Sequence, residues 1–281
     1  MDDLGDTRER GEGGGGLGRS LSLAVTFLTA VRLPEPDPTA GPARPADLWA
    51  SMAWYPLVGA AMGAAAWALY ALLLYALTPL LAAALVVVAL ELSSRALHLD
   101  GLMDTADGYF SGAPRERALE IMKDSRVGAM GVFAAIAVVV VKVSALAALA
   151  RPEAALALFG GLSVARALPA SDVRFFSYAR AEGTGAAFAL GASARESGAP
   201  VWAAAALGAA AALAAGALAF GWLGLLAGLL VGAAAAAGAL GAQALVARRL
   251  GGLTGDVYGM GIELAEAFAF IGAVVAARIL A

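Results

Sequence analysis

The sequence predicts an all-α fold, a polytopic transmembrane helical bundle of about six to eight spans whose cytoplasmic polar loops form the functional site. Of the 281 residues 61% are hydrophobic and only 15% are charged, and the mean hydropathy is +0.79. Soluble domains carry about 25% charged residues. Residues 52–90 and 201–247 contain no charge. Each stretch is long enough for two spans, because one span needs about 20 apolar residues.

The chain is expected to begin with a tail and to continue as one membrane domain. Residues 1–19 are acidic and glycine-rich, which is typical of a disordered tail. Residues 20–281 form the single integral-membrane domain. Within it, 20–31 is apolar but too short to span, so an interfacial or partly inserted helix is expected. The segment 34–45 contains five prolines and is expected to be a loop.

Hydropathy places the spans and two polar phrases between them. The expected spans cover residues 49–76, 79–99, 127–149, 153–170, 201–220 and 222–247, and an apolar segment at 267–281 ends the chain. The polar phrases are 100–126 and 248–266, and residues 171–199 are mixed in character. Four spans separate the two phrases. An even number returns the chain to the same side of the bilayer, so both phrases are expected on one face.

The cations agree with this topology. The expected shared face carries Arg115, Arg117, Lys123, Arg126, Arg174, Arg180, Arg195, Arg248 and Arg249. The opposite face receives little beyond Arg151 and Arg278. Because cytoplasmic loops are enriched in Lys and Arg, the shared face is predicted to be cytoplasmic. No basic block indicates nucleic acid as a partner, and the absence of cysteine excludes a thiolate metal site.

The phrase LHLDGLMDTADG at 97–108 holds three aspartates spaced four and three apart. On a helix Asp100, Asp104 and Asp107 lie within roughly 60° of one another. Like charges at this spacing repel. A hard cation such as Mg²⁺, held by carboxylates together with substrate phosphates, is the expected occupant. A solvated helix face beside the membrane is the structural alternative.

Three ionisable residues near this phrase have open roles. Glu91 lies inside an apolar segment and is a candidate substrate-binding group, with Arg95 at i+4 as an alternative ion-pair partner. His98 is a candidate catalytic base, for which it must reach a substrate hydroxyl, or a packing residue. Lys142 lies within an expected span without an obvious partner, so we expect it to snorkel toward the far surface.

A second phrase, RALEIMKDSRVG at 117–128, places two cations three residues apart. Lys123 and Arg126 could face one substrate across a helical turn and offset the charge of a diphosphate. Anchoring of the cytoplasmic face by positive charge is the alternative. Asp124 is either a further metal ligand or a salt-bridge partner.

The third phrase, GGLTGDVYGMGIELAE at 251–266, predicts a phosphate-handling loop that opens into a helix. Gly255 would expose a backbone donor, Thr254 a hydroxyl and Asp256 a metal ligand. Glu266 is a candidate substrate-binding residue or a satisfied buried polar group, and the same holds for Glu263.

Arg166 precedes Leu168-Pro169 near the cytoplasmic end of an expected span. Its guanidinium could bind a substrate phosphate. The alternative is a side chain that snorkels to the membrane interface.

The three phrases, in this order and spacing, resemble the cobalamin synthase family, adenosylcobinamide-GDP ribazoletransferase, over most of the chain from about residue 20. The resemblance implies an integral-membrane enzyme that requires Mg²⁺. It would join adenosylcobinamide-GDP to α-ribazole, or to α-ribazole 5′-phosphate, giving adenosylcobalamin or its 5′-phosphate and releasing GMP. Partners would be these substrates and the lipid bilayer, with other cobalamin-assembly enzymes as further candidates.

The resemblance also implies roles for individual residues. The metal ligands would be Asp100, Asp104, Asp107 and Asp256, and the catalytic residues would be Asp104, Lys123 and Arg126. His98 is a candidate catalytic residue only on the interpretation of the residues themselves. The sequence departs from the family pattern at Met103 and at 93–95, which puts in doubt how the helix before His98 packs.

Two other functions fit part of the pattern. A CDP-alcohol phosphatidyltransferase also uses clustered aspartates and a metal, but its phrase continues Asp-Gly with Ala-Arg, which is absent after Gly101. A cation transporter would place carboxylates near the bilayer midplane, often in repeated halves. No halves repeat here, and these carboxylates cluster with Lys and Arg near the predicted cytoplasmic face.

Overall fold

The computed structural model describes residues 16–34, 36, 39, 41–180, 182–194 and 198–280, and these are almost all helical, with no strand among them. The predicted all-α polytopic bundle is confirmed. Residues 1–15 of the expected tail and Arg195 lie outside the described residues. The first helix, α1, begins at Gly16, within the segment assigned to the tail.

Thirteen α-helices follow one another in the described part of the chain. They are α1 (Gly16–Leu28), α2 (Pro45–Ser51), α3 (Tyr55–Leu73), α4 (Pro79–Ser93), α5 (Leu97–Phe110), α6 (Arg115–Ile121), α7 (Ala129–Ala147), α8 (Arg151–Ala155), α9 (Leu162–Phe175), α10 (Thr184–Ala194), α11 (Ala199–Phe220), α12 (Gly224–Leu250) and α13 (Gly255–Leu280). Single turns of 3₁₀-helix lie at Met52–Trp54 and Gly221–Leu223, and the π-helical turn Leu156–Gly161 joins α8 to α9.

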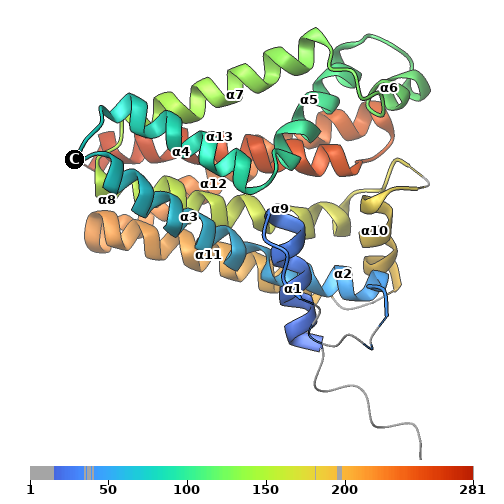
Figure 1. The fold of residues 1–281 in the computed structure, drawn as a ribbon, viewed down its shortest axis with the longest axis horizontal. Helices are drawn as coiled ribbons and strands as arrows, with labels where there is room; N and C mark the ends of the chain where they lie inside the picture. Colours follow the sequence, from blue (N-terminus) through green and yellow to red (C-terminus); the bar gives the residue numbers. More distant parts are fainter. Residues whose placement is uncertain are drawn as a thin grey trace, which may run out of the picture.

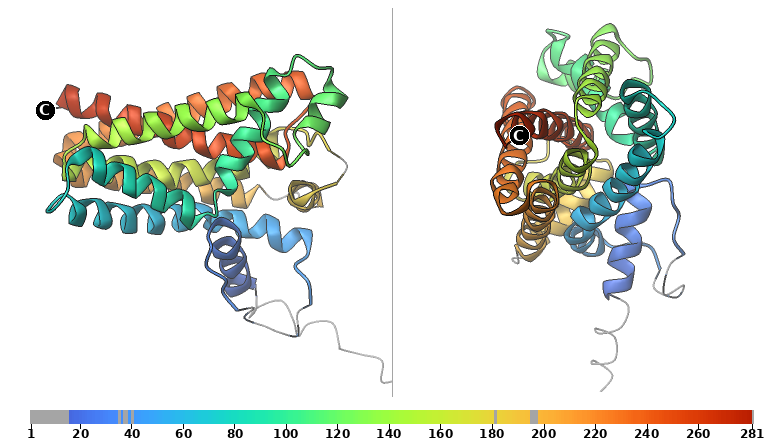
Figure 2. Two further views of the ribbon diagram at one scale, coloured as in Figure 1. Left: turned by 45° about the horizontal axis from the view of Figure 1, so that its top comes forward. Right: turned by 90° about the vertical axis from the view of Figure 1, so that its left-hand side faces the viewer.

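The long helices run side by side along one axis, while α5, α6 and α10 gather at the end away from the C-terminus (Figures 1 and 2). Five helical stretches are long and apolar enough to cross a membrane, or six if the bent pair α4–α5 counts as one span. One stretch, 199–250, consists of the two helices α11 and α12. If α11 and α12 are counted separately, the number of spans is six or seven, within the predicted six to eight.

Helices α11 and α12 form a tight antiparallel hairpin. The chain reverses at Gly221, whose φ is 63°. A Cβ atom at Gly216 would collide with the carbonyl oxygen of Gly224, and one at Gly228 would collide with that of Ala212. Lipid gives helices no hydrophobic reason to associate, so small residues that allow backbones to approach stabilise such pairs.

The stretch α8–α9 (Arg151–Phe175) is the centre of the bundle, with 83% of its most apolar window buried. Gly59 and Gly63 of α3 face the carbonyl oxygens of Leu162 and Leu158 so closely that a Cβ atom would not fit. Figure 2 shows neighbouring helices packed around this stretch in the view along the bundle.

Between α4 and α5 the chain bends by 88°. Arg95 and Ala96 adopt left-handed φ values of 58° and 54°. Glu91 and Asp100 therefore belong to two different helices, α4 and α5. Arg95 is not the partner of Glu91, since its guanidinium donates to the carbonyl oxygen of Thr26 at 3.4 Å.

The expectation that both polar phrases reach the same end is confirmed. Four long helical passes, α7, α8–α9, α11 and α12, separate α5 from α13. A Cβ atom at Gly101 of α5 would lie 2.6 Å from the carbonyl oxygen of Asp256. The third phrase is a short loop that opens into a helix, as predicted. Only 251–254 is non-helical, and everything from Gly255 onward belongs to α13.

We predict that Gly216→Ala destabilises the protein by about 1–3 kcal/mol, because the added methyl group forces α11 away from α12. Gly232→Ala is the matched control, since nothing lies within 4 Å of the position that its Cβ would take. The measurement is thermal unfolding in detergent. Equal melting temperatures for the two variants would contradict the described packing of the hairpin.

Candidate active site

A cavity of about 320 Å³ lies at the end of the bundle where the polar segments meet. Its walls come from α1, the start of α3 and the turn before it, the first turns of α5, α9, the segment between α9 and α10, α10 itself and the start of α13. One end carries the charged groups Asp100, Arg180 and Asp256. The remaining wall includes the aromatic side chains of Phe27, Tyr55, Tyr178, Phe188 and Tyr258. A concave, mostly apolar pocket with a few convergent polar groups is typical of a ligand site.

The turn 251–254 is fixed by pairing with the segment after α9. Leu253 donates its backbone N–H to the carbonyl oxygen of Ser177, and Ala179 donates to that of Leu253, both at 2.8 Å. Gly252, at φ 148°, lies so close to the Ser177 carbonyl that a side chain would not fit. The double glycine of the third phrase thus permits backbone contact with this segment, which carries Arg180 to the cavity.

Arg180 and Asp256 form an ion pair of 2.8 Å at the cavity wall, with side chains 13% and 24% exposed. Thr254 is fully buried just before α13. Its hydroxyl donates to Asp256 Oδ2 at 3.2 Å and accepts the backbone N–H of Val257 at 3.4 Å. Thr254 therefore orients Asp256 and caps α13, while the neighbouring Gly255 lines the cavity.

Asp100 and Asp104 form no hydrogen bond or ion pair through their carboxylates with any described residue. Both lie on α5, as the aspartate spacing predicts. Asp104 interacts electrostatically with Asp100, Asp256, Arg180 and Asp107, so these charges are grouped in space. Carboxylates without a bonded cation are oxygen ligands of the kind that a divalent ion prefers, and the ligand atoms of Asp100, Asp104 and Asp256 lie further apart than 4.8 Å in at least one pair.

Asp107 differs from these aspartates. Its two carboxylate oxygens accept the backbone N–H groups of Gly128 and Gly131 at 2.7 and 2.8 Å. A Cβ atom at either glycine would collide with the carboxylate. Gly128 precedes α7, so the negative charge lies at the positive end of that helix. Asp107 thus fastens α5 to α7, and its predicted role as a metal ligand stays a prediction.

Several buried polar atoms around the cavity have no hydrogen-bond partner. His98 Nε2, Tyr258 Oη and the Nε and Nη2 atoms of Arg180 are buried and unpaired among the described residues. All three residues line the cavity. Buried polar groups in proteins are nearly always hydrogen-bonded, so unpaired ones around one cavity point to a polar ligand. His98 thus lies at the predicted site, on the wall of the cavity.

Lys123 and Arg126 do not lie on a helix, which corrects the premise that they share a helical turn. They follow the end of α6 at Ile121. Arg126 binds Asp124 through Nε and Nη2 at 3.0 and 2.6 Å, and these hydrogen bonds lower the pKa of Asp124 to about 2. Arg126 and Asp107 line a separate hollow of about 160 Å³. Lys123 is exposed and makes no ion pair with a described residue.

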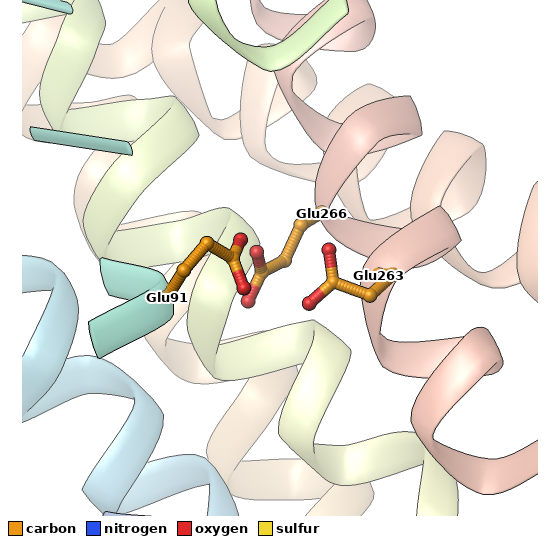
Figure 3. Close-up of side chains that lie close together, drawn as sticks. All are labelled: Glu91, Glu263 and Glu266. Carbon is orange, nitrogen blue, oxygen red and sulfur yellow. The ribbon is translucent and has the colours of Figure 1, made fainter. Parts of the chain in front are cut away.

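Below the cavity, a buried ion cluster joins four helices. Lys142 of α7 is fully buried, and its ammonium donates to Glu91 at 3.1 Å, Glu263 at 2.5 Å and Glu266 at 2.6 Å. Figure 3 shows the three carboxylates pointing toward one another. Arg166 of α9 forms the second ion pair of Glu266. The expectation that Lys142 snorkels to the surface is wrong, because it has three partners inside the bundle.

This cluster holds the only three carboxylates among the described residues whose ligand atoms all lie within 4.8 Å of one another. The ammonium of Lys142 already binds all three, so the cluster has its own cation. Glu91, Arg166 and Glu266, predicted as substrate-binding residues, are bonded within it and are absent from the cavity wall. Their contact with substrate stays a prediction.

Sequence reasoning did not assign a site role to Arg180 or to the two tyrosines, Tyr178 and Tyr258. Arg180 was counted only among the cytoplasmic cations, and it lies in the segment 171–199 that gave no clear pattern. The sequence could have indicated Tyr258 as a site residue, because Tyr258 lies in the same phrase as Asp256, two residues after it. The burial of Tyr178, which raises the pKa of its hydroxyl, comes from contacts distant in sequence.

Comparison with known proteins assigns the family. The family model described as cobalamin-5-phosphate synthase matches residues 20–274. The chain belongs to the cobalamin-5-phosphate synthase family. Proteins named adenosylcobinamide-GDP ribazoletransferase from Desulfitobacterium hafniense and Alkalilimnicola ehrlichii are 37% and 42% identical to it. These alignments cover 91% and 90% of this chain and 96% and 94% of the relatives. No solved structure matches the chain.

Membership of the cobalamin-5-phosphate synthase family confirms the resemblance carried by the three phrases. The matched region starts at residue 20 and ends within α13, so it contains the cavity, the aspartates of α5 and the buried cluster. The alternatives of a CDP-alcohol phosphatidyltransferase and of a cation transporter gain no support from these comparisons.

We predict that Lys142→Met destabilises the protein by about 3–5 kcal/mol, because it leaves three buried carboxylates without their cation. Lys123→Met is the matched control and should leave the melting temperature unchanged, since Lys123 is exposed. Thermal unfolding in detergent measures both variants. A Lys142→Met protein as stable as the parent would contradict the described cluster.

Proposed function

We propose that the chain is an adenosylcobinamide-GDP ribazoletransferase, a membrane enzyme of cobalamin biosynthesis that joins adenosylcobinamide-GDP to α-ribazole, or to its 5′-phosphate, and releases GMP. The observation that carries the proposal is the charged end of the cavity, where the unpaired carboxylate of Asp100 lies beside the Arg180–Asp256 pair and Asp104 of the same helix interacts electrostatically with all three. The names of the relatives support the same activity.

The reaction is a displacement at phosphorus. A ribose hydroxyl oxygen of the ribazole forms a bond to the corrinoid-linked phosphorus, and the bond from this phosphorus to the bridging oxygen breaks. GMP leaves with the bonding electron pair. A carboxylate at the charged end of the cavity accepts the hydroxyl proton. His98 and Tyr258 offer their unpaired polar atoms as hydrogen-bond partners to the bound substrates.

Mg²⁺ fits the oxygen-rich end of the cavity. Asp100, Asp104 and Asp256 would hold it, and Asp107 would support α5 from the side of α7. When bound, Mg²⁺ supplies charge neutralisation for the oxygens of the diphosphate. Lys123 and Arg126 keep their predicted role as cations that offset the charge of the departing GMP, approaching from the loop after α6.

The active end would face the cytoplasm. α6, the loop after it and the end of α12 bring Arg115, Arg117, Arg248 and Arg249 to this end, whereas Arg151 begins α8 at the other end of the bundle (Figure 1). The positive-inside rule favours the cytoplasmic side for the cation-rich end. We propose the cell inner membrane as the location, with the cation-rich active end on its cytoplasmic side. Other cobalamin-assembly enzymes are candidate partners.

The first test is the reaction itself, with purified protein in lipid vesicles given adenosylcobinamide-GDP, α-ribazole and Mg²⁺. Adenosylcobalamin and GMP should form in equal amounts. Asp100→Asn and Asp104→Asn should each lower the rate by about a hundred-fold or more, because each removes a charged oxygen ligand. Glu153→Gln, at the far end of the bundle, is the control and should keep full activity.

A different pattern is predicted for Asp107→Asn. Because Asp107 fastens α5 to α7 through two backbone hydrogen bonds, its loss should lower the melting temperature as well as the rate. Asp100→Asn should leave the melting temperature unchanged, since its carboxylate has no partner among the described side chains. Full activity of both α5 variants, Asp100→Asn and Asp104→Asn, would contradict the proposal.

Removal of divalent cations tests the cofactor. Chelation with EDTA should abolish product formation, and added Mg²⁺ should restore it. Ca²⁺ should restore it poorly, because it binds with longer and more irregular coordination than Mg²⁺. Undiminished turnover after exhaustive chelation would exclude a magnesium requirement.

A further inference from the structure

Arg180 stands between two cavities. It lines the cavity of about 320 Å³ described above and also a second cavity of about 280 Å³ between the end of α9 and α10. Among the described residues, Tyr178 is the only other one that lines both. The segment between α9 and α10 is therefore a shared wall, held in place by its backbone hydrogen bonds to Leu253.

The guanidinium of Arg180 is only partly used by the protein. Its Nη1 atom binds Asp256 at 2.8 Å, but Nε and Nη2 are buried without a partner among the described residues. A buried N–H group left unpaired costs free energy, so a ligand acceptor is expected there. The fork of an arginine matches the oxygens of a phosphate in geometry and charge.

The size of the two cavities limits what they can hold. Each is at the small end of the range for ligand pockets. A nucleoside fits such a volume, whereas a corrinoid is far larger. The proposed reaction involves two nucleoside-sized groups, the ribazole that attacks and the GMP that leaves. In a displacement at phosphorus these two groups lie on opposite sides of the reacting atom.

The walls of the two cavities differ in character. The larger cavity is lined mainly by aromatic and aliphatic side chains, among them Phe188, which packs edge to face on Phe27 at 5.2 Å between ring centres. The smaller cavity has Ser177 and Ser193 beside apolar residues such as Ala189 and Leu190. The Ser193 hydroxyl, which donates to the Ala189 carbonyl oxygen at 2.9 Å, is left as an acceptor. The larger one suits the apolar benzimidazole of ribazole, and the smaller one suits guanine, whose edge carries donors and acceptors.

We propose that Arg180 is the phosphate-binding residue of the reaction, with the ribazole in the larger cavity, the guanosine in the smaller cavity and the corrinoid outside both. This inference rests on the proposed function. Arg180 binds the diphosphate through Nε and Nη2, so that the ribazole hydroxyl reaches the corrinoid-linked phosphorus from one cavity while the GMP phosphate departs toward the other. The positive charge of Arg180 stabilises the oxygen that takes the electron pair of the broken bond.

The first test replaces Arg180. Arg180→Ala should lower kcat about a hundred-fold or more and lower the melting temperature as well, because Asp256 loses its ion pair; Arg180→Lys should recover little kcat, since an ammonium lacks the planar fork. Added guanidinium ion should partly restore the activity of Arg180→Ala, which a merely structural role would not allow. Arg174→Ala is the matched control, because Arg174 is exposed at the end of α9.

The second test separates the two cavities by equilibrium binding without turnover. Ala189→Leu, which fills the smaller cavity, should weaken GMP binding about ten-fold or more and leave α-ribazole binding unchanged. Phe188→Leu, in the larger cavity, should do the reverse. Arg180→Ala should weaken GMP binding but not α-ribazole binding.

The outcomes distinguish the inference from the function on which it rests. A parent protein that forms no adenosylcobalamin with both substrates and Mg²⁺ would overturn the proposed function. An active parent whose Arg180→Ala variant keeps its kcat and its affinity for GMP would overturn the inference alone. Binding changes that are the same for both ligands in Ala189→Leu and Phe188→Leu would overturn the assignment of the two cavities.

Discussion

The ammonium of Lys142, held by three glutamates, is the interaction on which the rest of this bundle depends. An unpaired charge inside a membrane-spanning bundle is strongly unfavourable, so Lys142 stays buried only because Glu91, Glu263 and Glu266 surround it. These partners come from α4 and α13, and Arg166 adds α9 through Glu266. The cluster therefore fixes α4, which leads into α5 with Asp100, relative to α13, which carries Asp256.

The charged groups at the end of the bundle differ from those of this cluster in how many partners they have. In the buried cluster Lys142 and Arg166 bond to glutamates, whereas at the bundle end Asp100, Asp104 and two nitrogens of Arg180 remain without partners among the described residues. The left-handed residues Arg95 and Ala96 turn α5 across the bundle end, and the 251–254 turn leads into α13 beside it. These unpaired groups at the bundle end are available to bind a charged substrate and its cation.

The sequence predicts the features that depend on local spacing. The apolar stretches, the aspartates along one face of α5 and the return of both polar phrases to one end follow from periodicity and from an even number of spans. Contacts between distant segments do not follow from spacing. The pairing of Lys142 with Glu91 crosses 51 residues, and the approach of Arg180 to Asp256 depends on a backbone pairing of Leu253 with 177–179. Only the fold brings these residues together.

The central claim is that the carboxylates of α5, with Asp256, bind a divalent cation together with a diphosphate at the end of the bundle. Electron paramagnetic resonance with Mn²⁺ in place of Mg²⁺ tests it most directly. Purified protein should bind Mn²⁺, its spectrum should change when GDP is added, and both signals should be lost in Asp104→Asn but kept in Glu153→Gln. A Mn²⁺ spectrum with the same response to GDP in Asp104→Asn as in the parent would contradict the account.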